Sequence, residues 1–220
     1  MSHERGATPE QQPVDYAAVG ATQAGDLLQY PPEGFVPVAD QIRLGSGVER
    51  FRASSSQLFN WIAQRHAGVT VSDVHVPAGD SYIGIRYDDD GTPLEQVRST
   101  GERRFGEDGV PEVSAGATLT LSGHAGGVAI SGRFRVVFVI EESHRSGFAL
   151  GSVESSSFSG EQSFVIEHRD DDSVWFVFRA FSRPLGLSTR LVPALHRRAL
   201  TGLATAYLRA MSPAWSTPGA

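Results

Sequence analysis

Hydrophobic residues recur along the chain with two different periods, and the first helical run lies near residue 60. Four apolar residues fall on one side of a helix: Leu58, Phe59, Ile62 and Ala63. Ser54 and Gln57 have the spacing of a capping box, in which the serine caps the helix and the glutamine is its third residue. We therefore expect a short helix that begins after Ser54 and ends before Gly68.

A longer helical pattern occupies the C-terminal part of the chain, from Arg190 to Met211. One apolar stripe runs along it, formed by Leu191, Leu195, Ala199, Leu203 and Tyr207. Ser188 or Thr189 can cap its start, and Pro193 is tolerated in the first turn. Gly202 inside a helix costs about 1 kcal/mol relative to alanine, which indicates either close approach to a neighbouring element or simple tolerance.

Between the helices the pattern is that of consecutive strands, rich in β-branched and aromatic residues. The predicted strands are Val69–Val76, Ser81–Tyr87, Thr118–Leu121, Val128–Glu141, Ser163–His168 and Val174–Phe181. The acidic runs at 88–91 and 170–172 indicate hairpin turns, and the polar stretch 92–116 indicates a long hairpin or excursion. Strands without alternating helices predict an α+β fold: a curved antiparallel sheet wrapping a long C-terminal helix, with one short N-terminal helix region.

Two of these strands are apolar on both faces, whereas a half-exposed antiparallel strand should alternate. In Val174–Phe181 one face carries phenylalanines and the other carries Trp175 and Val177. In the earlier strand, Phe134 and Phe138 are expected to share a face. We therefore expect both strands to be covered on both sides, by the long helix on one side and by an end segment, a second subunit or a ligand on the other.

Composition excludes several classes of function. The net charge is −6 and all 19 basic residues are arginine, which gives no basic surface for nucleic acid. The absence of cysteine excludes disulfides and thiolate chemistry, and no motif for a cofactor or metal is present. No apolar run approaches the roughly 18 residues of a membrane span. With a disordered leader at 1–12 and a loose tail at 213–220, we expect one cytoplasmic α+β domain over residues 13–212.

Short motifs point to turns and surfaces. Gly45, Ser46 and Gly47 lack the third glycine of a dinucleotide loop and a Walker lysine, so they indicate a turn before the first helix. The seven histidines are scattered and form no metal-binding pattern. No G-x-S-x-G nucleophile motif occurs.

Two glutamates, Glu154 and Glu161, are the candidates for acid–base chemistry, because a carboxylate that faces a cavity can serve as a general acid or base. Arg183 lies at the end of the last strand, on the face that carries Trp175. Its guanidinium could orient an anionic head-group, or it could form an ion pair with Glu161 or bond to the carbonyls at a helix end.

Motifs in order along nearly the whole chain resemble those of one family. They are Tyr16 with Val19–Thr22, Gly34–Phe35, Leu44–Gly47 with Phe51, Leu58 with Trp61, Arg135–Val137, Gly147–Gly151, Gly160–Glu161 with Phe164, Ala180–Pro184 and Tyr207–Met211. On these residues the chain resembles the bacterial and plant proteins of domain of unknown function 1990, also called uncharacterised protein family 0548. The resemblance implies a strand that enters the first helix and central strands at 135–137 and 147–151.

The chain departs from the family pattern in the length of Thr92–Ser131, which is greater than is usual in the family, and at two short motifs. Ser155–Phe158 stands where the family tends to carry Gly-His followed by Pro-Glu, and Gln162 replaces a glutamate. If that histidine and glutamate carry chemistry in the family, it is lost here. The order of elements also resembles the helix-grip fold of START-like and birch-pollen-allergen-like proteins, which implies a cavity for lipids, hormones or polyketides between sheet and helix.

Three hypotheses for function follow. The first is a non-enzymatic binder of a small hydrophobic or amphipathic molecule, held without a cofactor between the sheet and the C-terminal helix. The residues expected to line its cavity are Phe134, Phe138, Phe164, Trp175, Phe176, Phe178, Leu195, Leu203 and Tyr207, with Arg183 near the mouth. The second is a structural or interaction protein that forms a homodimer through the other apolar face. The third is a cyclase- or hydrolase-like enzyme that uses a pocket glutamate.

Overall fold

The computed structural model describes residues 13–77, 86–87, 93–94, 105–106, 109–155, 158–185 and 193–212. Several expectations lie outside these residues: the leader at 1–12, the tail at 213–220, the turn at 88–91, the helix caps Ser188 and Thr189, and Leu191 at the start of the predicted stripe. Of the predicted strand Ser81–Tyr87, only the last two residues are described.

Seven antiparallel strands form one sheet in the order β1-β9-β8-β7-β6-β5-β2. Their bounds are β1 Val36–Ser46, β2 Val69–His75, β5 Thr118–Ala125, β6 Val128–Glu141, β7 Arg145–Ser155, β8 Phe158–His168 and β9 Ser173–Pro184. Two short strands, β3 (Arg86–Tyr87) and β4 (Pro93–Leu94), pair separately. β6 has its predicted bounds, β5, β8 and β9 extend beyond theirs, and the turn at 170–172 joins β8 to β9 as predicted.

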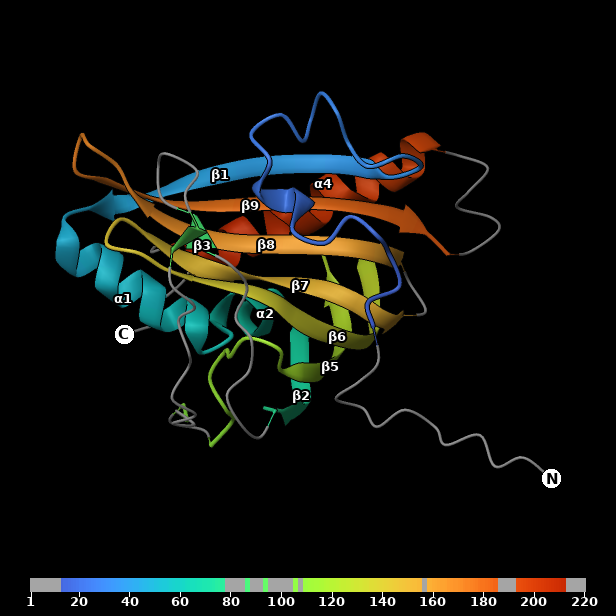
Figure 1. Cartoon of the computed structure of the whole chain (residues 1–220), viewed down its shortest axis with the longest axis horizontal. Coiled ribbons are helices and arrows are strands. Elements are labelled where there is room, and N and C mark those ends of the chain that lie inside the picture. The colour runs from blue at the N-terminus through green and yellow to red at the C-terminus, as the bar shows by residue number, and fades with distance from the viewer. Residues whose placement is uncertain are drawn as a thin grey trace.

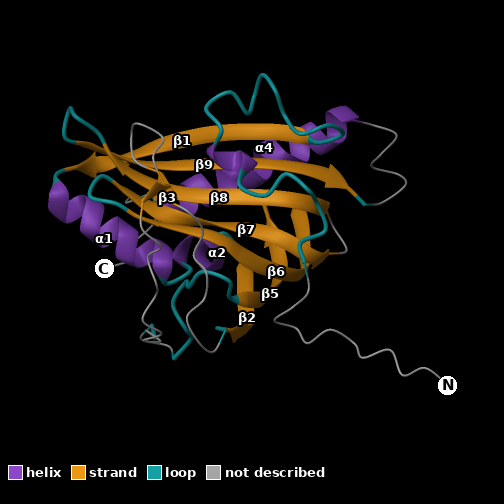
Figure 2. Ribbon diagram, viewed as in Figure 1, coloured by secondary structure: helices purple, strands orange, loops and turns teal. Residues whose placement is uncertain are grey.

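Three helices pack on one face of this sheet: α1 (Val48–Phe59), α2 (Ile62–His66) and the long C-terminal α4 (Pro193–Met211). In Figure 1, α4 lies behind the sheet, and the segment that precedes β1 crosses in front of it. We call the helix-covered side the inner face and the opposite side the outer face. The arrangement is the predicted α+β helix-grip fold, and the colouring by secondary structure in Figure 2 separates its helical and sheet layers.

The first helix differs from its prediction at both ends. It begins at Val48 after Gly47, and Ser54 is a buried residue inside α1 and not its cap. Glu49 in the first turn complements the partial positive charge of the helix start. The helical run also breaks at Trp61, whose φ of 63° is left-handed and whose buried indole donates a hydrogen bond to the Pro111 carbonyl at 2.8 Å. Burial of the large Trp61 ring therefore outweighs the helical sequence pattern, and the helix is interrupted at this residue.

The buried stripe of α4 also differs from its prediction. The buried residues are His196, Leu200, Leu203, Ala204, Tyr207, Leu208, Ala210 and Met211. Leu195 is 58% exposed, so its prediction as a lining residue is wrong. In a helix of 3.6 residues per turn, residues spaced by four rotate about 40° around the axis at each step. A stripe that faces the core at Tyr207 therefore faces away from it three steps earlier, at Leu195.

Gly202 of α4 lies in close contact with a neighbouring element, which is the first of the two explanations offered for a glycine inside this helix. A side-chain carbon on Gly202 would lie 2.6 Å from the carbonyl oxygen of Gly126, in the tight turn between β5 and β6. The same carbon on Gly126 would meet the Gly202 carbonyl at 2.0 Å. The two glycines therefore bring the helix and the β5–β6 turn into backbone contact, which fixes α4 across the far end of the sheet.

A register irregularity in β6 changes the face of one predicted residue. Between Val136 and Phe138 the pairing with β7 shifts, so Val139 lies opposite Phe148. Val139 then packs against the core, whereas Phe138 pairs with Ala149, whose neighbour Phe148 points inward. Phe138 therefore does not share the inner face with Phe134, because a β-bulge inverts the alternation that the sequence pattern assumes.

Candidate functional site

The interior between the sheet and the helices has an aromatic half. Phe164 of β8 lies at the centre, with its ring centroid 5.2 Å from Phe148, 5.3 Å from Phe178 and 5.1 Å from Tyr207 of α4. Phe148 also contacts Trp61 at 5.4 Å. Contacts at these separations contribute beyond simple burial, so this half is a packed aromatic core that joins β7, β8 and β9 to the helices.

The neighbouring half of the inner face carries smaller side chains. One cross-strand row runs through paired residues of five strands: Val136, Leu150, Gln162, Ala180 and Val38. Beyond this row Phe134 contacts Phe158, with ring centroids 5.9 Å apart. A glutamine and an alanine at the middle of the row fill less space than the phenylalanines of the aromatic half.

Several buried polar atoms beneath the helices have no hydrogen-bond partner. They include the Tyr207 hydroxyl, on a residue that is 0% exposed, Oε1 of Gln162, on a residue that is 3% exposed, and both amide atoms of Gln64 on α2, a residue that is 0% exposed. Gln162 lies two residues from Phe164 on the same face of β8, and Phe164 contacts the Tyr207 ring. Burial raises the pKa of Tyr207 above its usual value, so its phenol is a neutral donor and acceptor.

A histidine and a serine lie at the end of this interior where β9 leaves the sheet. Nε2 of His196 is 3.0 Å from Oγ of Ser182 and 3.2 Å from the Ser182 carbonyl oxygen. Both residues are buried. Burial lowers the pKa of His196, although its backbone contact with Ser182 acts in the opposite direction, so the ring is held neutral at pH 7.

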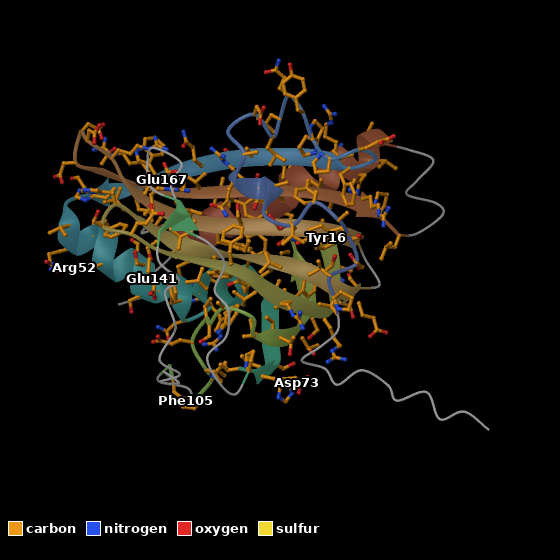
Figure 3. The ribbon with its side chains drawn as sticks, viewed as in Figure 1. Tyr16, Arg52, Asp73, Phe105, Glu141 and Glu167 are labelled. Carbon is orange, nitrogen blue, oxygen red and sulfur yellow. The ribbon has the colours of Figure 1, made fainter. Side chains whose placement is uncertain are left out.

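On the outer face, the segment before β1 is attached to the sheet by one carboxylate. Glu161 of β8 is fully buried and accepts four hydrogen bonds: from the Tyr16 hydroxyl at 2.8 Å, the Gly20 amide at 2.7 Å, the Thr22 amide at 3.1 Å and the Thr22 hydroxyl at 2.5 Å. Figure 3 places Tyr16 over this face. Burial, reinforced by the Glu161 charge, raises the pKa of Tyr16.

Apolar contacts and a second carboxylate complete this attachment. Tyr16, Leu27 and Phe181 form a small buried cluster, and the ring of Phe35 lies 5.3 Å from that of Phe181. The carboxylate of Asp15 accepts hydrogen bonds from the hydroxyls of Ser152 and Ser159, at 2.6 and 2.7 Å. The segment from residue 13 to β1 therefore covers the outer face of β8 and β9, as the end-segment alternative predicted.

Comparison with family models decides the family. The model described as "Domain of unknown function (DUF1990)" matches residues 15–87 and 96–210, which is most of the chain. The chain belongs to this family. Tyr16, Glu161, Gln162, His196 and Tyr207 all lie within the matched residues, so both faces described above belong to the DUF1990 domain. A comparison with curated proteins gave no match.

Solved structures with similar folds were found at low sequence identity. A hypothetical protein from Helicobacter pylori has a TM-score of 0.49 and 11% identity, covering 88% of this chain and 94% of that one. The ginseng major latex-like protein 151 from Panax ginseng has a TM-score of 0.44 and 12% identity, covering 81% and 99%. A START superfamily protein from Mycobacterium smegmatis has a TM-score of 0.38 and 14% identity, covering 79% and 94%.

The DUF1990 fold brings together six of the residues expected to line a cavity. They are buried in the core cluster of the inner face: Phe134, Phe164, Phe176, Phe178, Leu203 and Tyr207. The others lie elsewhere. Trp175 is half-buried beneath the Arg169 guanidinium, and Arg183 stacks on Phe35 at 5.1 Å, which places both on the outer face and moves Arg183 away from the predicted mouth. Leu195 is exposed, and the bulge removes Phe138 from the inner face.

The two candidate acid–base glutamates occupy different settings. Glu154 is exposed at the end of β7. Glu161 is buried, but its two oxygens already accept four hydrogen bonds from the N-terminal segment, on the face opposite the interior. Within the described residues no group of three or more His, Asp or Glu could hold a metal ion. None of the described helices is long and apolar enough to cross a membrane.

Sequence reasoning missed Gln162 and His196 as interior residues. Gln162 carried a signal, since it is a polar residue that shares the inward face of β8 with Phe158, Phe164 and Ile166. His196 lies between exposed neighbours on α4, and only the true rotation of the helix places it inward.

Proposed function

We propose that this DUF1990 protein binds a small apolar or amphipathic molecule between the inner face of the sheet and α4, and that it does so without catalysing a reaction. The observation that carries the proposal is the pair of unpartnered polar atoms, the Tyr207 hydroxyl and Gln162 Oε1, inside an otherwise apolar interior. More than nine in ten buried polar groups in proteins have a partner, and an unpaired one costs about 1–3 kcal/mol. A bound molecule that bonds to both atoms removes this cost.

The surroundings fit such a ligand. The row through Leu150, Gln162 and Ala180 has small or flexible side chains, beside an aromatic wall formed by Phe164 and Tyr207. Apolar walls with a few placed polar groups are the usual lining of small-molecule sites. The setting of the two glutamates supports a role without acid–base catalysis by either of them, because Glu154 is exposed and Glu161 already accepts four hydrogen bonds on the other face.

The test uses a neutral fluorescent probe, N-phenyl-1-naphthylamine, whose emission rises in an apolar site. The wild-type chain is expected to bind it with a micromolar dissociation constant. Ala180→Leu adds three carbons to the middle of the row, where Ala180 is fully buried. If a ligand normally occupies this space, the variant keeps its unfolding midpoint in urea and loses at least tenfold in probe affinity.

The matched control is Ala129→Leu, the same change at an exposed position of β6, which should alter neither quantity. Two results contradict the proposal. One is a wild-type chain that does not bind the probe. The other is an Ala180→Leu variant destabilised by about 1–3 kcal/mol with unchanged probe affinity, which is the behaviour of an overfilled core that holds no ligand.

A further inference from the structure

Among the described residues, no charged side chain is fully buried on the inner face. No described arginine is buried, and the chain has no lysine. The buried titratable residues in the described part of the chain are Tyr16, Glu161, His196 and Tyr207. Tyr16 and Glu161 bond to each other on the outer face. Among the described residues, a phenol and an imidazole are therefore the only fully buried titratable groups on the inner face.

Neither of these two groups supplies a charge at neutral pH. Burial raises the pKa of Tyr207, so the phenol keeps its proton, and burial lowers the pKa of His196, so the ring stays neutral. A carboxylate or ammonium group on a ligand would be buried here without an opposite charge. Such burial is far more costly than burial of a neutral polar group.

The hydrogen-bonding capacities of Gln162 Oε1 and the Tyr207 hydroxyl limit which neutral group of a ligand can bond to both atoms. Oε1 of Gln162 only accepts a hydrogen bond, so its partner has to carry an O–H or N–H. The Tyr207 hydroxyl both donates and accepts. A hydroxyl on the ligand can donate to Gln162 and accept from Tyr207, whereas an ether or ketone oxygen can accept from Tyr207 only.

We infer that the molecule held in this interior is an uncharged, hydroxyl-bearing apolar compound, such as a phenol or a long-chain alcohol, and not a carboxylate or an amine. The inference rests on the proposed binding function and deepens it by assigning the ligand's chemical class. In this assignment Tyr207 and Gln162 bind the hydroxyl of the ligand. The row through Leu150 and Ala180 contacts its apolar body. Fatty acids and other anionic amphiphiles are excluded by this assignment.

Three bicyclic compounds that share one apolar body test this assignment: naphthalene, 2-naphthol and 2-naphthoate. Each displaces N-phenyl-1-naphthylamine from the purified full chain at pH 7, and the dissociation constants are compared. We expect 2-naphthol to bind about fivefold or more tightly than naphthalene, the equivalent of one net hydrogen bond. We expect 2-naphthoate to bind at least tenfold more weakly than 2-naphthol.

Substitutions then test whether Tyr207 and Gln162 cause the tighter binding of 2-naphthol than of naphthalene. Tyr207→Phe and Gln162→Leu keep the approximate side-chain shape and remove the unpaired atoms, so the free protein should fold with a circular dichroism spectrum like that of the wild type. In the double variant, 2-naphthol and naphthalene should bind with equal affinity, and naphthalene itself should bind as it does to the wild type. Tyr30→Phe, at a tyrosine that is 68% exposed, is the matched control and should keep the advantage.

The outcomes separate the two claims. If 2-naphthoate binds as tightly as 2-naphthol, or if the double variant keeps the advantage of 2-naphthol, the assignment of a neutral hydroxylated ligand is wrong while the binding function stands. If the wild-type chain binds neither the fluorescent probe nor any of the three compounds, the binding function fails and the assignment falls with it.

Discussion

Replacement of Glu161 by glutamine measures how much the attachment of the N-terminal segment contributes to stability. The carboxylate accepts two hydrogen bonds at each oxygen: from Tyr16 and Gly20 at Oε2, and from the amide and hydroxyl of Thr22 at Oε1. A glutamine of the same shape carries one oxygen and one nitrogen, and the nitrogen donates but cannot accept. One oxygen site therefore loses its function whichever way the amide is turned.

The magnitude follows from which donors can adjust. With the nitrogen at the Oε2 position, the Tyr16 hydroxyl can rotate to accept, but the Gly20 amide cannot. With the nitrogen at the Oε1 position, the Thr22 hydroxyl can rotate, but the Thr22 amide cannot. In either orientation one buried backbone N–H faces a donor, which costs about 1–3 kcal/mol of folding stability. The remaining hydrogen bonds are also weaker, because their acceptor is no longer ionised. We expect Glu161→Gln to lower the free energy of unfolding by about 2–4 kcal/mol.

Urea unfolding at pH 7, followed by circular dichroism, measures this loss. Glu154→Gln is the matched control: the same change at an exposed glutamate of β7 should shift the free energy of unfolding by less than about 0.5 kcal/mol. Tyr16→Phe removes one donor and should cost less than Glu161→Gln. The double variant should cost less than the sum of the two, because both changes affect one hydrogen bond.

Amide hydrogen exchange at Gly20 and Thr22 distinguishes detachment of the segment from global unfolding. If the segment opens separately, Glu161→Gln removes protection at these amides while the sheet keeps its own. A variant with both the wild-type urea midpoint and wild-type protection at Gly20 and Thr22 would refute the reasoning, since the four hydrogen bonds would then contribute nothing measurable.

Two further predictions concern α4. The unfolded chain protonates His196 more readily than the folded chain, because burial lowers the pKa of the folded ring; stability is therefore complete above the unfolded pKa of about 6.5 and is lost as pH falls below it. His196→Gln should reduce this acid-side slope in urea midpoints measured from pH 7.5 to 5, and an unchanged slope would contradict it. Gly202→Ala should destabilise by about 1–3 kcal/mol despite alanine's better helix propensity, because the added carbon meets the Gly126 carbonyl; an increase in melting temperature would show that the contact relaxes freely.

The strands that could be predicted from the sequence are those whose residues themselves favour extended structure. β6 is rich in β-branched and aromatic residues and has its predicted bounds, and β9 was recognised as apolar on both faces. β1 gave no comparable signal, because it is an edge strand with Pro37 and Asp40 among its residues. Its place before α1 came only from the family resemblance.

The errors share a cause, since tertiary contacts overrode local patterns. Ser54 and Gln57 have the spacing of a capping box and predicted a helix start, whereas α1 begins at Val48, after Gly47, without a side-chain cap. The bulge after Val136 is a property of the pairing between β6 and β7, so a period of two cannot indicate it. The residues that bond to Glu161 lie in an irregular segment without periodicity, and nothing in the sequence of Tyr16 or Thr22 indicates a partner more than 130 positions away.

Adjacent residues of β8 separate the stability of this protein from its proposed function. Glu161 points to the outer face and holds the chain's own N-terminal segment, while Gln162 points to the inner face beside Leu150 and Ala180. Phe181, one of the outer apolar residues that suggested a dimer interface, is covered by this segment. Because the sheet backbone lies between the two side chains and they share no partner, their effects should be separable. Glu161→Gln should lower stability and leave the preference among naphthalene, 2-naphthol and 2-naphthoate unchanged, whereas Gln162→Leu should change that preference and leave the N-terminal segment protected from exchange.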